Sequence, residues 1–381
     1  MGNGIRVIIG GDLGPTRSNY SIFSKGNIKE LVTTELNDLL SLADFRIFNL
    51  EVPLTDKENP ISKDGPNLIA PISTINGIKS LNPSVLCLGN NHIMDHGEQG
   101  LFQTQEQLSK FGILSVGAGK NIKEAATPVI LARENLRIGI YSCAENEFSI
   151  ARHNKAGANP FDPLESPDHI TSLKNECDYV IVLHHGGKEQ YRYPSPELQK
   201  VCRKMINKGA ELVVCQHSHC VGSYEQFKNG TIIYGQGNFL FDRHDNEFYQ
   251  TGLILNVKFS TGIEVEFIPI QKEGNGVKLP DYESRERILN EFLQRSEKIK
   301  SPDFVERQFD QYCRENGQYY LANLAGLGKT IRRIDKVLKR PLTRLIYSGR
   351  KLNTIRNHFE CETHREILLR YLEILKADKL R

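Results

Sequence analysis

Short apolar runs rich in Val, Ile and Leu recur through the first part of the chain, and each one ends in a polar or glycine-rich stretch. This recurrence restricts the fold more than any other feature, because runs of this length and composition are typical of buried β-strands. The runs, with the polar residues that follow them, are IRVIIGGD (5–12), ADFRIFNLE (43–51), SVLCLGNNH (84–92), LRIGIYSC (136–143), YVIVLHHGG (179–187), ELVVCQHSH (211–219) and TIIYGQGNF (231–239).

Helical patterns lie between several of these strands. They include NIKELVTTELNDLL (27–40), GEQGLFQTQEQLSKFG (97–112) and SPELQKVCRKMINKGA (195–210), two of which reach a glycine where a helix commonly ends. Strands that alternate with helices predict an α/β fold. In such folds ligands bind beyond the carboxyl ends of the strands, which is where the polar residues of this sequence gather.

From about Pro280 the strand pattern gives way to charged helical patterns such as SRERILNEFLQRSEKIK (284–300). A chain of 381 residues exceeds what one core usually needs, so we predict an α/β domain over residues 1–275 and a helical region over 281–381. Residues 321–360 hold ten Lys/Arg against two Asp/Glu. Such a region either attracts a polyanion or an acidic lipid surface, or packs as a solvated helical face on the first domain.

The composition excludes several other classes of protein. No apolar run approaches the roughly 20 residues of a membrane-spanning helix, and a polar stub leads straight into the first strand, so we expect neither an anchor nor a signal peptide. The eight scattered cysteines form no CxxC pair, which favours a reducing compartment. We therefore expect a cytoplasmic protein, with peripheral binding at the inner face of the membrane as a variant. The slightly acidic first domain predicts no nucleic-acid partner.

The first candidate functional residues are acids and amides at strand ends. Asp12 and Glu51 each follow a strand directly, and a carboxylate at such a position can bind a cation or bridge two. In the segment GNNHIMDHG (89–97), the Asn91 carboxamide can ligate a metal and the His92 imidazole can protonate a leaving group. Asp95 can orient His92. The alternative is an ordinary polar turn.

Histidines follow two further strands. Neighbouring side chains on extended backbone face opposite directions, so one of His184 and His185 points into the site, and we favour His184. The same segment supplies Glu189. After the next strand, His217 and His219 form an H-x-H pair that presents both imidazoles to a common side of an extended backbone, a spacing that suits two adjacent metals. Each pattern alone is weak, but their shared position at strand ends favours a metal-dependent hydrolytic site.

Taken together, these segments resemble the successive motifs of the CapA family of bacterial capsule or poly-γ-glutamate biosynthesis proteins. The family is similar in turn to calcineurin-like metallophosphoesterases, so the resemblance implies a four-layer α/β sandwich, two β-sheets flanked by helices, with a helical C-terminal extension. It covers about residues 5–270 and rests on GGD (10–12), NLEVPLT (49–55), NNHIMDHGEQGL (90–101), VGAGKN (116–121), VLHHGGKE (182–189), QHSHCV (216–221) and YGQGNFLFD (234–242).

The resemblance also implies a role for individual residues around a dinuclear metal centre. Asp12 and His219 would hold the first metal, and Glu51 would bridge the two. The second metal would be held by Asn91, His184 and His217. His92, oriented by Asp95, would be the general acid. Residues expected to line the substrate cleft are Asn49, Asn90, His185, Glu189 and Asn238.

One departure from the phosphoesterase pattern affects the metal count. A histidine is expected two positions after the first Asp, and this chain has Gly14 there, so either one or two divalent ions of Mn, Fe or Zn are expected. The implied function is metal-dependent hydrolysis of a phosphoester, γ-glutamyl or other amide bond in surface-polymer biosynthesis. An anionic surface polymer or its precursor is the expected partner, with membrane-associated biosynthesis proteins as partners of the basic region. The alternative is a non-catalytic assembly or polymer-binding protein that retains the fold.

Overall fold

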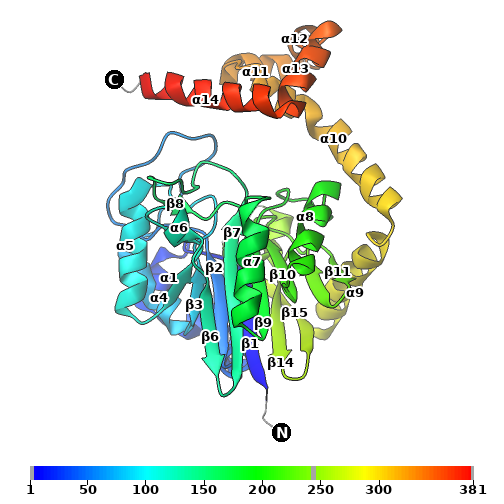
Figure 1. Ribbon diagram of the computed structural model, residues 1–381. Helices are drawn as coiled ribbons and strands as arrows, with labels where there is room; N and C mark the ends of the chain where they lie inside the picture. Colours follow the sequence, from blue (N-terminus) through cyan, green and yellow to red (C-terminus); the bar gives the residue numbers. More distant parts are fainter. Residues whose placement is uncertain (1–3, 242–245, 379–381) are drawn as a thin grey trace. The chain divides into compact units, whose positions relative to one another are not determined.

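The computed structural model describes residues 4–241 and 246–378, and the chain divides into two compact units, Met1–Val305 and Glu306–Arg381 (Figure 1). Within the described part of the first unit, the larger sheet has eight strands. Seven of them lie in the order β16 (Gly276–Lys278), β15 (Ile263–Glu273), β14 (Thr251–Phe259), β1 (Ile5–Gly14), β2 (Phe45–Leu50), β3 (Val85–Cys87) and β4 (Leu114–Val116), and β13 (Asn238–Phe241) also pairs with β1. Strands β1 to β4 are mutually parallel, whereas β14, β15 and β16 are antiparallel additions.

The second sheet has six strands within the described residues. Their order is β11 (Tyr224–Phe227), β12 (Gly230–Ile233), β10 (Leu212–Gln216), β9 (Tyr179–His185), β7 (Leu136–Ala144) and β6 (Val129–Arg133). The four inner strands run parallel, so their carboxyl ends meet at one edge. Two short strands, β5 (Ala118–Gly119) and β8 (Gly157–Ala158), pair separately beside α6 (Ile122–Ala125).

Three apolar layers hold the two sheets and their helices together. One core lies between the sheets, where Ile9 and Ile47 of the larger sheet meet Ile181 and Val214 of the smaller one. The outer face of the smaller sheet is covered by α7 (Glu165–Glu176) and α8 (Pro196–Asn207) (Figure 1). The outer face of the larger sheet is covered by α1 (Tyr20–Lys25), α2 (Ile28–Leu31), α3 (Thr34–Ser41), α4 (Ile75–Ser80) and α5 (Gly97–Lys110). The predicted four-layer sandwich is confirmed.

Strands of the smaller sheet are buried on both faces, which decides where their last residues point. In β9, Ile181 and Leu183 belong to the core between the sheets, whereas Val180 and Val182 belong to the core beneath α7 and α8. A strand buried on both faces reads as a continuous apolar run, without the alternation that would reveal which face is which. The two histidines at the end of β9 therefore lie on different faces of the sheet, His185 on the face of Ile181 and Leu183 and His184 on the face of Val180 and Val182.

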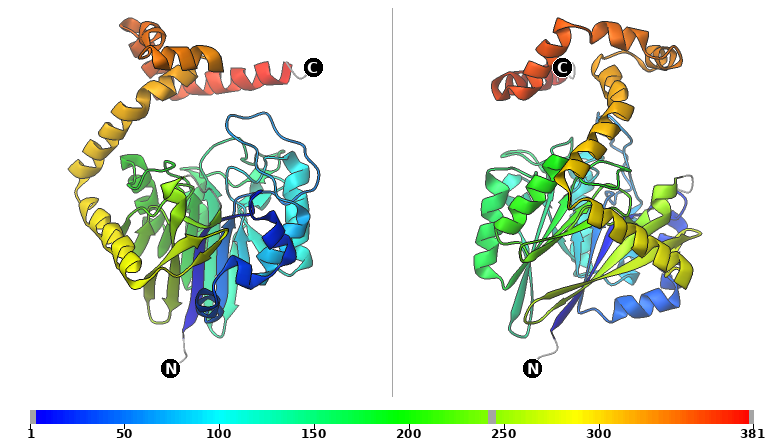
Figure 2. Two further views of the ribbon diagram at one scale, coloured as in Figure 1. Left: turned by 180° about the vertical axis from the view of Figure 1, so that it is seen from behind. Right: turned by 90° about the vertical axis from the view of Figure 1, so that its right-hand side faces the viewer.

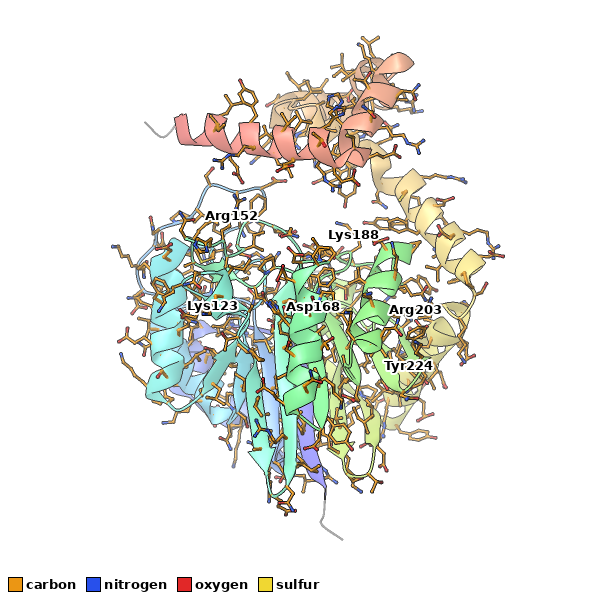
Figure 3. The ribbon with its side chains drawn as sticks, in the orientation of Figure 1. Lys123, Arg152, Asp168, Lys188, Arg203 and Tyr224 are labelled. Atoms are coloured by element: carbon orange, nitrogen blue, oxygen red, sulfur yellow. The ribbon has the colours of Figure 1, made fainter. Side chains whose placement is uncertain are left out.

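The first unit extends beyond the boundary expected near residue 280. Helix α9 (Tyr282–Lys298) lies along β11 and β15 (Figure 2). The Phe292 ring stacks on Tyr224, labelled in Figure 3, with centroids 5.3 Å apart, and Arg295 Nε donates a hydrogen bond to the carbonyl of Gly222 at 2.7 Å. Val305, near the start of α10 (Pro302–Leu324), is also buried in the first unit. Because α9 packs on the first unit, the boundary between the two units lies after residue 305.

The second unit is helical, as the sequence predicts. It comprises the rest of α10 followed by α11 (Lys329–Val337), α12 (Pro341–Ile346), α13 (Arg350–Glu360) and α14 (Glu362–Asp378). The buried Asp335 carboxylate ties α11 to α12, because it accepts hydrogen bonds from the backbone N–H groups of Leu342 and Thr343. Within the described residues, no helix of either unit has the length and apolar content required to cross a membrane.

Candidate metal centre

Two groups of potential metal ligands share one carboxylate at the carboxyl edge of the sandwich. Asp12, Glu51 and His219 form the first group, and Glu51, His185 and His217 form the second. Within each group, one ligand atom from every residue lies within 4.8 Å of the others, and all five residues are buried. Figure 3 allows this end of the sandwich to be found by the label of Lys188, which lies on the loop after β9. Side chains separated by some two hundred positions therefore converge, and Glu51 lies between two candidate cation positions.

Asp12 owes its position to a bulge in β1. The pairing of β1 with both β2 and β13 shifts register next to Asp12, and the two glycines before it permit a close approach of neighbouring groups. A Cβ on Gly11 would lie 1.9 Å from the carbonyl oxygen of Gly237. The Asp12 carboxylate is fully buried and accepts a hydrogen bond from Asn49 Nδ2 at 2.8 Å, while its other oxygen lies 3.4 Å from His219 Nδ1.

Glu51 is the least compensated group of the site. It follows β2 directly, and its backbone N–H donates to the carbonyl of Leu13 at 2.9 Å, which fixes its position beside Asp12. Its side chain is completely buried, and neither carboxylate oxygen has a hydrogen-bond partner among the described residues. Two imidazole nitrogens lie near Oε1, His185 Nε2 at 3.4 Å and His219 Nε2 at 3.8 Å. A buried carboxylate left in this state is costly unless a cation or proton is supplied.

The structure reverses the expected orientation of His184 and His185. His185 is the histidine that faces the site: its Nε2 lies 3.0 Å from Asn91 Oδ1 and 3.1 Å from His217 Nδ1. His184 turns away, with Nδ1 3.5 Å from Cys143 Sγ and its ring against Phe161. The two neighbouring side chains do face opposite directions, but the choice of His184 was wrong, because His185 shares its face with Ile181 and Leu183 of the core between the sheets. The candidate metal ligands lie at the edge of this core, so the residue that faces the core at the end of β9 also faces the site.

His217 and His219 converge by a different route from the one expected. They lie beyond the end of β10 and both have left-handed backbone conformations, with φ of 88° and 54°, so the H-x-H pair is not on extended backbone. Such conformations are uncommon for residues other than glycine and are typical of functional sites. Asn238 Oδ1 lies 2.9 Å from His219 Nδ1, and the ring of Tyr249 stacks on His219 with centroids 4.9 Å apart.

Three asparagines connect the candidate ligands to one another. Asn91 brings its Oδ1 next to His185, as described above. Asn49 and Asn90 were expected in the cleft, but both are completely buried. Asn90 Nδ2 donates to Asn49 Oδ1 at 3.1 Å, and Asn49 Nδ2 also lies 3.2 Å from His185 Nδ1. Asn49 and Asn90 therefore lie behind the candidate ligands and hold them in position.

His92, Asp95 and Lys63 form a separate, largely buried group, and His92 is its most exposed member. His92 Nδ1 lies 2.6 Å from Asp95 Oδ2, and the second oxygen of Asp95 pairs with Lys63 Nζ. The side chain of Asp95 is fully buried, that of Lys63 is 3% exposed and that of His92 is 12% exposed. Lys63 was not found from the sequence, because it lies in a charged loop, ENPISKDGPN (58–67), where nothing distinguishes it from a solvated lysine.

Two further sequence expectations concern the rim of the site. Glu189 is half-exposed, and its Oε1 lies 4.0 Å from His217 Nε2. At Gly14, a Cβ would lie 2.7 Å from the ring of Phe241, which itself packs against His219. The ring of Phe241 thus fills the space that a histidine at position 14 would need.

Burial and charge shift the pKa of several groups in opposite directions. Burial, with the charge of Asp12, raises the pKa of Glu51 to about 8. Burial lowers the pKa of His185 to about 4 and also lowers that of His217. Burial alone would lower the pKa of His219, but the Glu51 and Asp12 carboxylates raise it to about 9. Two neutral imidazoles beside buried carboxylates are a donor set that suits a divalent transition metal.

One protein family and several curated proteins match this chain. Residues 6–243 match the family described as bacterial capsule synthesis protein PGA_cap. The chain is similar to the capsule biosynthesis protein CapA of Bacillus anthracis, with 29% identity over 223 residues that cover 56% of this chain and 54% of that protein. It is equally similar, at 29%, to the PGA biosynthesis protein CapA of Bacillus subtilis over 53% of this chain and 54% of that one. The chain thus spans about half the length of the curated relatives it matches.

Two solved structures are also similar to part of this chain. One is a phosphatase from Mycoplasma pneumoniae, with a TM-score of 0.45, 16% identity and coverage of 72% of this chain and 95% of that one. Another is a putative 5'-nucleotidase from Staphylococcus aureus, with a TM-score of 0.43, 11% identity and coverage of 75% of this chain and 58% of that one.

Proposed function

The chain belongs to the bacterial capsule synthesis protein family, and we propose that its first unit is a divalent-metal-dependent hydrolase acting in the biosynthesis of capsule, poly-γ-glutamate or a surface polysaccharide. The observation that carries the proposal is the Glu51 carboxylate, which is shared by two ligand groups and has no hydrogen-bond partner on either buried oxygen among the described residues. Its chemistry fits a bridging metal ligand.

The proposed ligands divide between two cation positions. Asp12 and His219 would hold one ion, and His185, His217 and the Asn91 carboxamide would hold the other, with Glu51 common to both. When bound, divalent ions such as Mn, Fe or Zn acidify water and offset negative charge that develops on the substrate. Because the Phe241 ring takes the place of a ligand at Gly14, we expect the Asp12 position to bind its ion more weakly.

We assign proton donation to His92. Its Nδ1 is held by Asp95, so the other ring nitrogen, Nε2, is available to donate to a leaving group, and the partly exposed side chain is accessible to substrate. Lys63 offsets the charge of Asp95 and so holds the carboxylate in the position that orients the ring. The bond cleaved would be a phosphoester, a γ-glutamyl link or another amide, and the substrate an anionic surface polymer or its precursor.

A second candidate function, a non-catalytic assembly or polymer-binding protein, is favoured by Gly14 alone, because that position removes one ligand of the phosphoesterase pattern. The two functions differ in what they require of His92. Assembly or polymer binding requires no general acid, whereas hydrolysis does.

Metal content and turnover together test the proposal. The purified protein would be analysed for bound metal and assayed with Mn²⁺ or Zn²⁺ on a generic phosphodiester and on a γ-glutamyl anilide. We expect one or two ions per chain and an activity that His92→Ala lowers about 10²-fold or more, without loss of metal. A protein that binds metal but turns over neither substrate would favour the assembly function. Full activity in His92→Ala would overturn the assigned mechanism.

We further propose that the protein works in a reducing compartment such as the cytoplasm. All eight cysteines are free thiols, including Cys202 and Cys215, whose buried Sγ atoms lie 3.5 Å apart without a bond. Counting free thiols in protein purified without reductant tests this, with eight expected per denatured chain and fewer counting against it.

A further inference from the structure

The second unit concentrates positive charge on a few short helices. Residues 306–381 carry 17 Lys/Arg against 9 Asp/Glu, whereas the whole chain carries 49 against 46, so the other 305 residues have a net charge of −5. The excess is densest on α11 and the turn that follows it. An electrostatic attraction to an anionic surface would therefore act through this unit rather than through the molecule as a whole.

Five of these cations surround one cavity of about 270 Å³. Among the described residues its lining contains no acid, and it consists of Tyr319, Ala322, Asn323, Lys329, Arg332, Arg333, Lys336 and Arg340. Arg332 Nη1 donates to Asn323 Oδ1, but its Nε is buried and has no hydrogen-bond partner among the described residues. A buried, unpaired guanidinium N–H among like charges is costly, and an anionic oxygen would satisfy it. The cavity is large enough for a phosphate group.

Helix α11 separates its cations from its apolar side chains. Lys329, Arg332, Arg333 and Lys336 follow the i, i+3, i+4, i+7 spacing of a single helix face, and Ile331, Ile334 and Leu338 follow the i, i+3, i+7 spacing of another. Asp335, the acid of this helix, is buried in its contact with α12 and does not oppose the cationic face.

The apolar side chains of this unit are unusually exposed. Val337 at the end of α11 is 82% exposed, and Leu345 of α12 is 69% exposed. Ile367, Leu369 and Leu372 of α14 are each about 60% exposed. Side chains project from all these helices (Figure 3). A unit of this size rarely exposes so many large apolar side chains to water unless they meet an apolar phase or another molecule.

We propose that the second unit docks the protein on the surface of an anionic phospholipid bilayer, with the cationic cavity of α10 and α11 binding lipid phosphates and the exposed apolar side chains entering the headgroup region. Short amphipathic helices with Lys and Arg on one face bind membranes in this way. A soluble polyanion would use the cations but leave the apolar groups in water. A second copy of the chain would cover the apolar groups but would bring two cationic units together. An anionic bilayer satisfies both features.

Vesicle flotation with the full-length chain tests the proposal. At about 0.1 M salt, we expect the protein to float with vesicles containing about 30% phosphatidylglycerol and not with pure phosphatidylcholine vesicles. The triple variant Lys329→Gln/Arg333→Gln/Lys336→Gln should bind about 100-fold more weakly, since each cation near such a surface contributes about fivefold. The double variant Val337→Ser/Leu345→Ser should lose about tenfold or more.

Matched substitutions in the first unit control for net charge and apolar content. Lys29→Gln/Lys200→Gln/Lys204→Gln changes the charge by the same amount, and Leu42→Ser/Leu164→Ser removes two side chains that are 65% and 79% exposed. Both controls should float as the wild type does. All substituted side chains are exposed, and circular dichroism checks that the helices persist.

Several results would overturn the proposal. Absence of binding to phosphatidylglycerol vesicles by the wild type would do so, as would equal losses in the control variants. Light scattering that detects a dimer in the absence of vesicles, abolished by Val337→Ser/Leu345→Ser, would assign the apolar surface to a second copy. Binding of soluble polyglutamate in place of vesicles would assign the cations to a polymer.

Discussion

Replacing Glu51 by glutamine should stabilise the metal-free protein and destabilise the metal-loaded one. In the metal-free fold, burial raises the pKa of Glu51 to about 8, from 4.5 in an exposed chain. The folded state therefore holds a proton that the unfolded state releases between these two values. The stability contributed by the neutral carboxyl is complete below pH 4.5 and is lost as pH rises through 8.

The size of this effect follows from the shift. Each unit of pKa corresponds to about 1.4 kcal/mol, so Glu51 costs the metal-free fold about 3 kcal/mol at pH 7 and about 5 kcal/mol above pH 8. Glutamine has no such cost. Its introduction also removes part of the attraction that keeps His219 charged, so we expect a net gain of about 1–3 kcal/mol at pH 7 and almost none at pH 4.5.

Metal should reverse the order of stability. A divalent ion at about a thousand times its dissociation constant stabilises the wild type by roughly 4 kcal/mol, which exceeds the variant's lead of about 1–3 kcal/mol, and the variant, which lacks the bridging carboxylate, should gain little. Urea unfolding followed by circular dichroism, with EDTA or with Mn²⁺ at pH 5, 7 and 8, measures both effects. The exposed Glu176→Gln substitution is the control and should change stability by less than about 0.5 kcal/mol. A metal-free Glu51→Gln protein that is less stable than the wild type at pH 7, or whose gain is the same at pH 5 and pH 8, would refute this reasoning.

Three further predictions concern other parts of the fold. Burial lowers the pKa of His184 to about 4, so the stability of the wild type should fall by about 2 kcal/mol from pH 7 to pH 5 on account of this residue, and urea unfolding of His184→Gln should show that much less acid sensitivity. Gly11→Ala should cost more than about 2 kcal/mol in the same assay and reduce bound metal, because its Cβ meets backbone, whereas Gly262→Ala enters open space and should be neutral. Lys63→Met should lower the free energy of unfolding by about 3–5 kcal/mol, because it leaves the Asp95 carboxylate buried without its cation, and Lys63→Arg should lower it less. A loss below about 1 kcal/mol in Lys63→Met would show that Lys63 does not offset the charge of Asp95.

The sequence pattern alone predicted an α/β fold and the neighbourhood of the site, whereas the layers of the fold were implied by the resemblance to the CapA family. Short apolar runs separated by helical patterns identify buried parallel strands, and the carboxyl ends of such strands have to meet at one edge. Asp12, Glu51 and Asn91 could be placed there for that reason alone. The helical structure of the last hundred residues could also be predicted, because the strand patterns stop near Pro280.

The sequence could not predict which way individual side chains face, the local backbone conformation, or how helices and loops pack on the sheets. His184 and His185 are chemically identical, and β9 is apolar on both faces, so no alternation showed which face meets the other sheet. The left-handed backbone at His217 and His219 carries no sequence signal, because neither residue is glycine. Lys63 reaches Asp95 only through the path of a long loop. The boundary at residue 305 depends on how α9 packs on β11 and β15, a tertiary contact that helical periodicity does not reveal.

The site draws its side chains from both halves of the sandwich. Asp12 lies in β1 and Glu51 directly follows β2 of the larger sheet, whereas His185 ends β9 and His217 directly follows β10 of the smaller one. Ions bound by these groups would link the two sheets at the edge where their parallel strands end. Loading with metal should then slow amide hydrogen exchange in β1, β2, β9 and β10 together. Exchange should stay unchanged in the turn between β14 and β15, which lies beside Ile5 at the opposite end of β1 from Asp12.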